Sequence, residues 1–222
     1  YIAGSDLVRY LQDISMHTDY KLAAITGFFT GVFLLPLLYN LEIVFPFGIP
    51  RFMVVVIIPF LWMAGIWLGN VLSRWVSIMA QFSRYTAAGF LSFAIDFGIF
   101  NLLIMLTGIT SGLNLSLFKG TSYLFANMNA YLWNKYWVFR IYTPGDGITL
   151  HSVLREYGRF LAVSLVGFVI NVSITSFTVD IIGPRFGFSG KAWANLAAIA
   201  AVAIAIVWNF TGYKLFVFRK KQ

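Results

Sequence analysis

Six apolar stretches of about 20 residues each dominate this sequence and constrain its fold more than any other feature. They lie at about residues 22–44, 52–73, 85–107, 115–138, 160–182 and 190–213. A helix needs about 20 apolar residues to cross the hydrocarbon core of a bilayer. Backbone groups inside that core must be satisfied within the segment itself, which favours α-helices. The sequence therefore predicts an all-α, polytopic membrane helix bundle with six spans.

The composition agrees with a membrane bundle and disfavours several other classes. Hydrophobic residues make up 59% of the chain and charged residues 11%, against about 45–50% and about 25% in soluble domains. Cys is absent, and the two His residues, His17 and His151, lie far apart. We therefore expect no disulfide, no metal site and no cofactor. A P-loop and a nucleophile elbow are also missing, so we expect that the chain is not an enzyme.

An excess of Lys and Arg predicts the orientation in the membrane. The net charge is +8, and six spans divide the 16 basic residues into twelve on the side of the N-terminus and four on the other side. The four are Arg51, Lys119, Arg185 and Lys191. The positive-inside rule places both termini in the cytoplasm of a cell with an inner (plasma) membrane. No basic soluble module is present, so we expect membrane lipids and not nucleic acid as partners.

Residues 1–20 differ from the apolar stretches. Leu7, Leu11 and Ile14 recur at helical spacing with charged residues between them. This pattern predicts a short amphipathic helix at the membrane interface, with a frayed tail as the alternative. Residues 21–81 then supply the first two spans.

The rest of the chain contains an internal repeat, with one copy at 83–140 and a second at 158–219. The first span of each copy aligns at an offset of 75, and the end of each copy aligns at an offset of 79. The matched pairs include Arg84 with Arg159, Asp96 with Asn171, Lys135 with Lys214 and Arg140 with Arg219. Two spans per copy give both copies one orientation, so we expect a parallel repeat about the membrane normal.

Both copies carry motifs of a known family. The first has Arg84-Tyr85, Gly89, Asp96, Asn129 and Asn134-Lys135-x-Trp137-Val138-Phe139. The second has Arg159-Phe160, Asn171, Asn209 and Lys214-x-Phe216-Val217-Phe218. In these motifs the chain resembles the GtrA-like family, which is related to the transmembrane domain of dolichyl-phosphate mannose synthase-like enzymes. The resemblance covers about residues 82–220, which predicts a four-span GtrA-like domain over 82–222.

The resemblance implies a role in the metabolism of polyprenyl-phosphate-linked sugars. Members are thought to flip a monosaccharide linked to undecaprenyl or dolichyl phosphate across the membrane, for cell-surface polysaccharides. The alternative is a non-catalytic anchor or partner subunit of a polyprenyl-phosphate glycosyltransferase. A small multidrug-type exporter is a third reading, which the basic interfacial residues disfavour. The sequence is compatible with a homo-oligomer and does not identify the sugar.

Asp96 is the strongest single candidate for function. It lies twelve residues after Arg84, which places it about 18 Å along the helix at about 1.5 Å per residue. A carboxylate at that depth is costly and usually faces the interior of a bundle. Counting back from Phe139 places Asn127 and Asn129 at the same depth, and Asn171 takes the place of Asp96 in the second copy. These side chains suit sugar hydroxyls; the alternative is simple bonding between helices.

Four basic residues bracket the two copies at the expected cytoplasmic interface. They are Arg84, Arg159, Lys135 and Lys214. They are candidates for holding a lipid phosphate, with Trp137 as an interfacial anchor. The alternative is the ordinary collar of basic and aromatic residues found at membrane interfaces.

The predicted topology can be tested by labelling, because the chain has no Cys of its own. Cysteines introduced at Gly48, Gly112 and Gly187 should react with an impermeant thiol reagent added outside the cell. Cysteines introduced at Gly145 and Gln222 should not react. Labelling of residue 145 from outside would contradict the six-span orientation.

Overall fold

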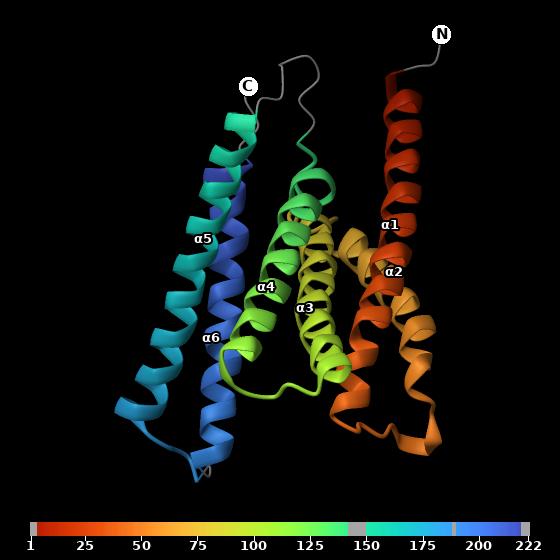
Figure 1. The fold of residues 1–222 in the computed structure, drawn as a ribbon. Helices are drawn as coiled ribbons and strands as arrows, with labels where there is room; N and C mark the ends of the chain where they lie inside the picture. Colours follow the sequence, from red (N-terminus) through yellow and green to blue (C-terminus); the bar gives the residue numbers. More distant parts are fainter. Residues whose placement is uncertain (1–3, 142–149, 188–189, 219–222) are drawn as a thin grey trace. The chain divides into compact units, whose positions relative to one another are not determined.

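The computed structural model describes residues 4–141, 150–187 and 190–218, and all regular structure in these ranges is helical (Figure 1). The long helices are α1 (Gly4–Asn40), α2 (Val54–Leu72), α3 (Met79–Thr107), α4 (Gly112–Trp133), α5 (Leu150–Ser176) and α6 (Gly190–Gly212). Short helical turns are η1 (Pro46–Gly48), η2 (Arg51–Met53), η3 (Asn134–Val138), η4 (Phe177–Ile182) and η5 (Tyr213–Val217). The predicted polytopic helical bundle is therefore confirmed.

Five helical segments in the described residues are long and apolar enough to cross a membrane. They are Met16–Asn40, Arg51–Leu72, Met79–Thr107, Leu150–Ile182 and Ala200–Val217. The remaining predicted span corresponds to α4, which has 22 residues and is long enough for a crossing of about 30 Å. Its hydropathy is lower because Lys119, Asn127 and Asn129 lie within it. The assignment of α4 as a span rests on its length and on its pairing with α3.

The N-terminal segment is helical as predicted, but it is not a separate element. Helix α1 runs for 37 residues without interruption, so the expected boundary between residues 20 and 21 is absent. The sequence Asp19-Tyr20-Lys21-Leu22 contains no Gly or Pro to end a helix there. The polar residues at this point mark a contact with other helices and not the end of α1.

The chain divides into two compact units, residues 1–140 and residues 141–222. In unit 1, α1 packs against α2 and α3, and α3 packs against α4 (Figure 1). Glycines allow the close approach of α1 to α2. A Cβ atom placed on Gly27 would lie 2.5 Å from the Cα atom of Pro59, and one on Gly31 would lie 2.6 Å from the Cα atom of Val55. The first two helices are thus an integral part of the unit.

Unit 2 is a helical hairpin of α5 and α6. Its core at one end is aromatic: the rings of Phe160 and Tyr213 stack with their centroids 4.5 Å apart. The hydroxyl groups of Ser164 and Tyr213 share a hydrogen bond of 2.7 Å. Gly212 brings α6 close to Val163 of α5. These contacts hold the two helices together at the end that carries the repeated motif.

The two copies of the repeat share an unusual local structure. The matched motifs form the π-helical turns η3 and η5 at the ends of the two hairpins. The amide of Phe139 donates to the carbonyl of Asn134 at 2.9 Å, and the amide of Phe218 donates to that of Tyr213 at 2.8 Å. Isolated π-turns are rare and often occur at functional sites. The copies therefore match in local structure as well as in sequence, and their rotation about the membrane normal stays a prediction.

Close packing of α1 on α2 can be tested with a matched pair of glycine substitutions. Gly31→Val should lower the thermal midpoint, because the new side chain meets the backbone of residues 54 and 55, and overpacking typically costs about 1–3 kcal/mol. Gly65→Val is the control, since a Cβ atom at Gly65 has nothing within 4 Å. Thermal unfolding of both variants in detergent gives the comparison. Equal midpoints would contradict the close α1–α2 contact.

Candidate functional site

A buried carboxylate, Asp19 of α1, binds the end of the α3–α4 hairpin. Nη1 of Arg84 donates to Oδ2 at 2.9 Å, and Nη2 of Arg140 lies 2.6 Å from both carboxylate oxygens. The indole Nε1 of Trp137 donates to Oδ1 at 2.9 Å. Asp19 is only 3% exposed and Trp137 only 2%. We call Asp19, Arg84, Trp137 and Arg140 the Asp19 cluster.

The local structure of the hairpin brings these donors to one point. Arg84 lies in the second turn of α3, while Trp137 lies in the π-turn η3 and Arg140 follows that turn. Arg140 has a φ angle of 52°, a left-handed conformation that is uncommon for a residue with a side chain. Two guanidinium groups therefore surround one carboxylate. Removing one partner of such a buried pair typically costs about 3–5 kcal/mol.

Sequence analysis missed Asp19, and it described Arg84 as a candidate for holding a lipid phosphate and Trp137 as an interfacial anchor. The structure shows that Trp137 is buried, that Arg84 is largely buried, and that both bond to α1. One signal was available: the chain has only eight acidic residues, and Asp19 immediately precedes the first apolar stretch. An acid at that place is a natural counter-charge for the basic residues that begin and end the neighbouring spans.

The other predicted basic residues differ in their surroundings. Lys135 is buried: its Nζ donates to the hydroxyl of Tyr131 at 3.2 Å and lies 5.8 Å from the ring centre of Tyr136. Arg159 and Lys214 are exposed on unit 2. The four basic residues are thus buried in the first copy of the repeat and open in the second.

Asp96 is paired with Lys119, a basic residue of the predicted span 115–138 that sequence analysis counted on the side opposite the N-terminus. Nζ of Lys119 lies 2.6 Å from Oδ2 of Asp96, and the hydroxyl of Ser122 donates to Oδ1 at 2.7 Å. The Lys119 ammonium also lies over the rings of Phe97 and Phe100, at 4.8 and 5.4 Å from their centres. In the structure Lys119 lies within α4. The charge of Asp96 is therefore balanced inside the hairpin.

The expectation that Asp96, Asn127 and Asn129 share one depth is wrong. Nδ2 of Asn129 donates to the hydroxyl of Ser92 at 3.0 Å, one turn away from Asp96. Asn127 is buried, and its Nδ2 atom lies 3.5 Å from the hydroxyl oxygen of Tyr123 on the same helix. The sequence-based estimate counted forward from Arg84 and back from Phe139, and it assumed that these two residues lie at the same depth in the membrane.

The actual register differs from that count by about one turn. Nε2 of Gln81 donates to the carbonyl of Val138 at 3.3 Å, so the end of η3 is level with the residue three positions before Arg84. Counting fifteen residues along each helix from this contact places Tyr123 level with Asp96, one residue from Ser122, which bonds to Asp96.

A third polar contact lies further along α3, after Ser92 and Asp96. Nδ2 of Asn40 on α1 donates to Oδ1 of Asn101 at 2.9 Å, and Asn101 is buried. Asn171, the counterpart of Asp96, is half-buried on α5. In unit 2, Gly167 leaves the space that the Asn209 amide occupies, which corresponds to the contact between Ser92 and Asn129 in unit 1. The candidate sugar-binding residues therefore meet in pairs at different levels and not at one point.

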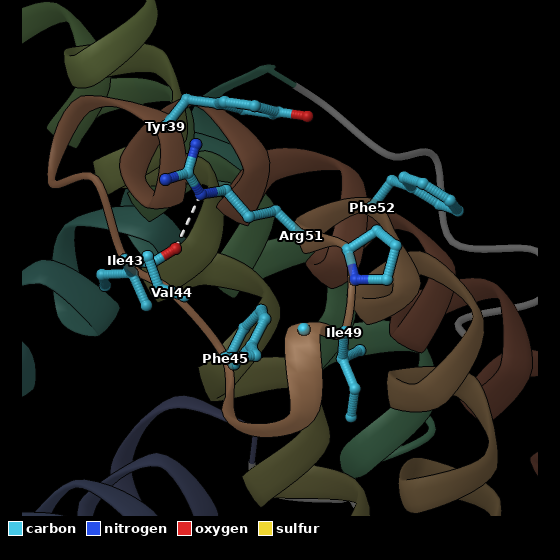
Figure 2. A pocket seen from close by; sticks show the side chains of 9 residues that line it. Tyr39, Ile43, Val44, Phe45, Ile49, Arg51 and Phe52 are labelled. Carbon is cyan, nitrogen blue, oxygen red and sulfur yellow. Dashed lines mark hydrogen bonds between the residues drawn. The ribbon is translucent and has the colours of Figure 1, made fainter.

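A pocket of about 400 Å³ lies at the connection between α1 and α2. Figure 2 shows Arg51 across this pocket, where its Nε donates to the carbonyl of Ile43 at 2.6 Å. The Arg51 guanidinium also lies over the Tyr39 ring, 5.1 Å from its centre. The lining contains none of the predicted site residues. Within the described residues, no group of three or more His, Asp or Glu is placed to hold a metal ion.

The corrected register of α3 and α4 can be tested by oxidation of paired cysteines. Ser92→Cys with Asn129→Cys should form a disulfide under mild oxidation, because the native side chains are in contact and disulfides need Cβ atoms about 3.5–4.5 Å apart. Asp96→Cys with Asn129→Cys should stay reduced. Gel mobility of protein cleaved between α3 and α4 gives the result. Cross-linking of only the second pair would restore the earlier register.

Comparison with known proteins gives one match. The family described as GtrA/DPMS, transmembrane domain, matches residues 84–218, which is more than half of the chain. No curated protein and no solved structure matches the chain. The match begins at Arg84 and ends at Phe218, so it includes both hairpins and both π-turns, and α1 and α2 lie outside it. The chain is therefore a multi-pass membrane protein that belongs to the GtrA/DPMS transmembrane-domain family.

Proposed function

We propose that this protein translocates a polyprenyl-phosphate-linked monosaccharide across the membrane, for glycosylation of cell-surface polysaccharides. The observation that carries the proposal is the ion pair of Asp96 and Lys119 within the α3–α4 hairpin. Ionisable residues inside spans are costly and usually mark the paths of polar substrates. Membership of the family supports a lipid-linked sugar as that substrate.

The polar residues of the hairpin suit a sugar that moves along it. Ser92 and Asn129 form one level, and Asp96, Ser122 and Lys119 form the next. Hydroxyl and amide groups both donate and accept hydrogen bonds, and a carboxylate accepts them, so together they can replace the water around sugar hydroxyls. The lipid tail would remain outside the helices, in the bilayer. Asn171 on α5 contributes the equivalent position of the second copy.

The phosphate of the substrate requires cations on both sides of the membrane. In unit 1 the partly exposed Arg140 supplies one on the expected cytoplasmic side, and in unit 2 Arg159 and Lys214 are exposed on their own hairpin. Lys119 supplies a cation toward the opposite side, since it lies sixteen residues from Lys135, or about 24 Å along the helix. Cations of this kind bind phosphate through charge-assisted hydrogen bonds. The arrangement therefore offers a phosphate contact near each end of the hairpin.

A second candidate function is a non-catalytic anchor or partner subunit of a polyprenyl-phosphate glycosyltransferase. The observation that favours it is the family itself, whose description includes the DPMS transmembrane domain. In that case the polar pairs of the hairpin serve only to hold the helices together. Both candidates place the protein in the inner (plasma) membrane with its termini in the cytoplasm, and both are compatible with a homo-oligomer.

Removal of the intramembrane charges distinguishes a substrate path from bonding between helices. Asp96→Asn and Lys119→Gln should each lower the thermal midpoint, because each leaves one charge without its partner. The double variant should recover stability. Transport of labelled lipid-linked sugar into proteoliposomes should nevertheless remain reduced in all three by about tenfold or more, since hydrogen bonds to charged groups contribute about 1.5–3 kcal/mol.

The control is Asp180→Asn, which removes an exposed acidic group from unit 2 and should change neither measurement. Recovery of transport together with stability in the double variant would assign the pair to helix packing alone. If wild-type protein co-purifies with a glycosyltransferase and transports nothing, the anchor function replaces the proposal.

A further inference from the structure

The Asp19 cluster has the donors of a site for an oxyanion. Two guanidinium groups and one indole N–H converge on two oxygen atoms, and Arg140 contacts both of them. Guanidinium groups also bind phosphate through charge-assisted hydrogen bonds. The carboxylate of Asp19 therefore occupies a site whose chemistry would equally accept a phosphate.

One donor of this site has no acceptor on the carboxylate. Nε of Arg84 is buried without a hydrogen-bond partner. Asn70 Nδ2 is likewise a buried donor without a partner. The two residues lie where α2 ends and α3 begins. Buried polar groups without partners are uncommon and call for an explanation, and a larger oxyanion at this end of unit 1 would supply one.

The cluster is open on one side. The Arg140 side chain is 34% exposed, while that of Arg84 is 13% exposed. Arg140 follows η3 in a strained conformation with φ at 52°. A ligand from the membrane interface would therefore reach Arg140 first and then meet Arg84 and Trp137.

We propose that Arg84, Trp137 and Arg140 form a binding site for a phosphate group, and that Asp19 occupies this site in competition with the phosphate. Helix α1 then acts as an internal competitor, because a carboxylate and a phosphate are both negative and need the same N–H groups. The identification of a lipid-borne phosphate as the natural ligand rests on the proposed function. The site itself does not depend on transport, so it can be tested separately.

The test compares the thermal midpoint of the full chain in detergent, in chloride and in inorganic phosphate at equal ionic strength. Asp19→Asn keeps the shape of the side chain and removes its charge. In chloride the variant should unfold several degrees below wild type, because the guanidinium groups of Arg84 and Arg140 lose the charge of the carboxylate between them. Inorganic phosphate should restore most of that loss. Wild type should respond little, because its own carboxylate fills the site.

Asp180→Asn is the control, since it removes an exposed carboxylate of unit 2. The difference between its midpoint and that of wild type should be the same in chloride and in phosphate. If Asp19→Asn is too unstable to purify in chloride, recovery of folded protein only in phosphate supports the site. Equal losses of Asp19→Asn in both salts would overturn the proposal and leave Asp19 as a structural contact.

A second arm distinguishes free phosphate from a lipid phosphate. Short-chain phosphatidic acid and inorganic phosphate are titrated against Asp19→Asn and wild type, with short-chain phosphatidylcholine, whose zwitterionic head group has no net charge, as the reference. Tighter binding of phosphatidic acid than of inorganic phosphate assigns the site to a lipid-borne group. Competition predicts that Asp19→Asn binds phosphatidic acid more tightly than wild type does, by about 5- to 150-fold, the usual range for coupled sites. Weaker binding by the variant would contradict competition.

Discussion

The buried carboxylate of Asp19 is the interaction on which the rest of unit 1 depends. It joins α1 to the start of α3 and to the π-turn after α4 through four bonds to three side chains. Glycines along α1 bring it against α2, and Gly98 of α3 brings α3 against Phe33 of α1. Although α1 and α2 lie outside the family match, they complete the packing of the first hairpin, and Arg84 and Arg140 have their counter-charge on α1.

Sequence reasoning succeeded where the signal is local. Apolar runs located the helices because burial in lipid acts on each segment separately. The repeated Lys-x-aromatic-Val-Phe motif located the ends of the two hairpins, where the structure has the π-turns η3 and η5. Sequence reasoning failed where two distant segments meet. The pairing of Asp19 with Arg84 and Arg140 joins residues more than 60 positions apart, and the α3–α4 register depended on a choice of reference residues that was wrong by about one turn. The continuous α1 was missed because its polar residues were interpreted as the end of a helix.

Helix α4 shows why the least apolar segment of a membrane protein can be the most informative. Its polar residues lower its hydropathy, yet Lys119, Ser122 and Asn129 bond to partners on α3. A polar side chain that is paired across a hairpin costs far less in lipid than a free one. The polar residues of α4 therefore identify the face of this helix that packs against α3. The same residues line the proposed path of the sugar.

The two hairpins share a backbone design but not a distribution of charge. Both end in the same π-turn, and an amide of the later helix meets a small residue of the earlier one in both, as Asn129 meets Ser92 and Asn209 meets Gly167. The first hairpin adds the ion pair of Asp96 with Lys119 and the buried Asp19 cluster, whereas the second has Asn171 and leaves Arg159 and Lys214 exposed. Because a π-turn and a small-residue contact need only local sequence, a duplication preserves them easily. A buried charge needs a partner on another helix, so it persists only where that partner is present, and in the described part of this chain α1 and α4 supply such partners to the first hairpin.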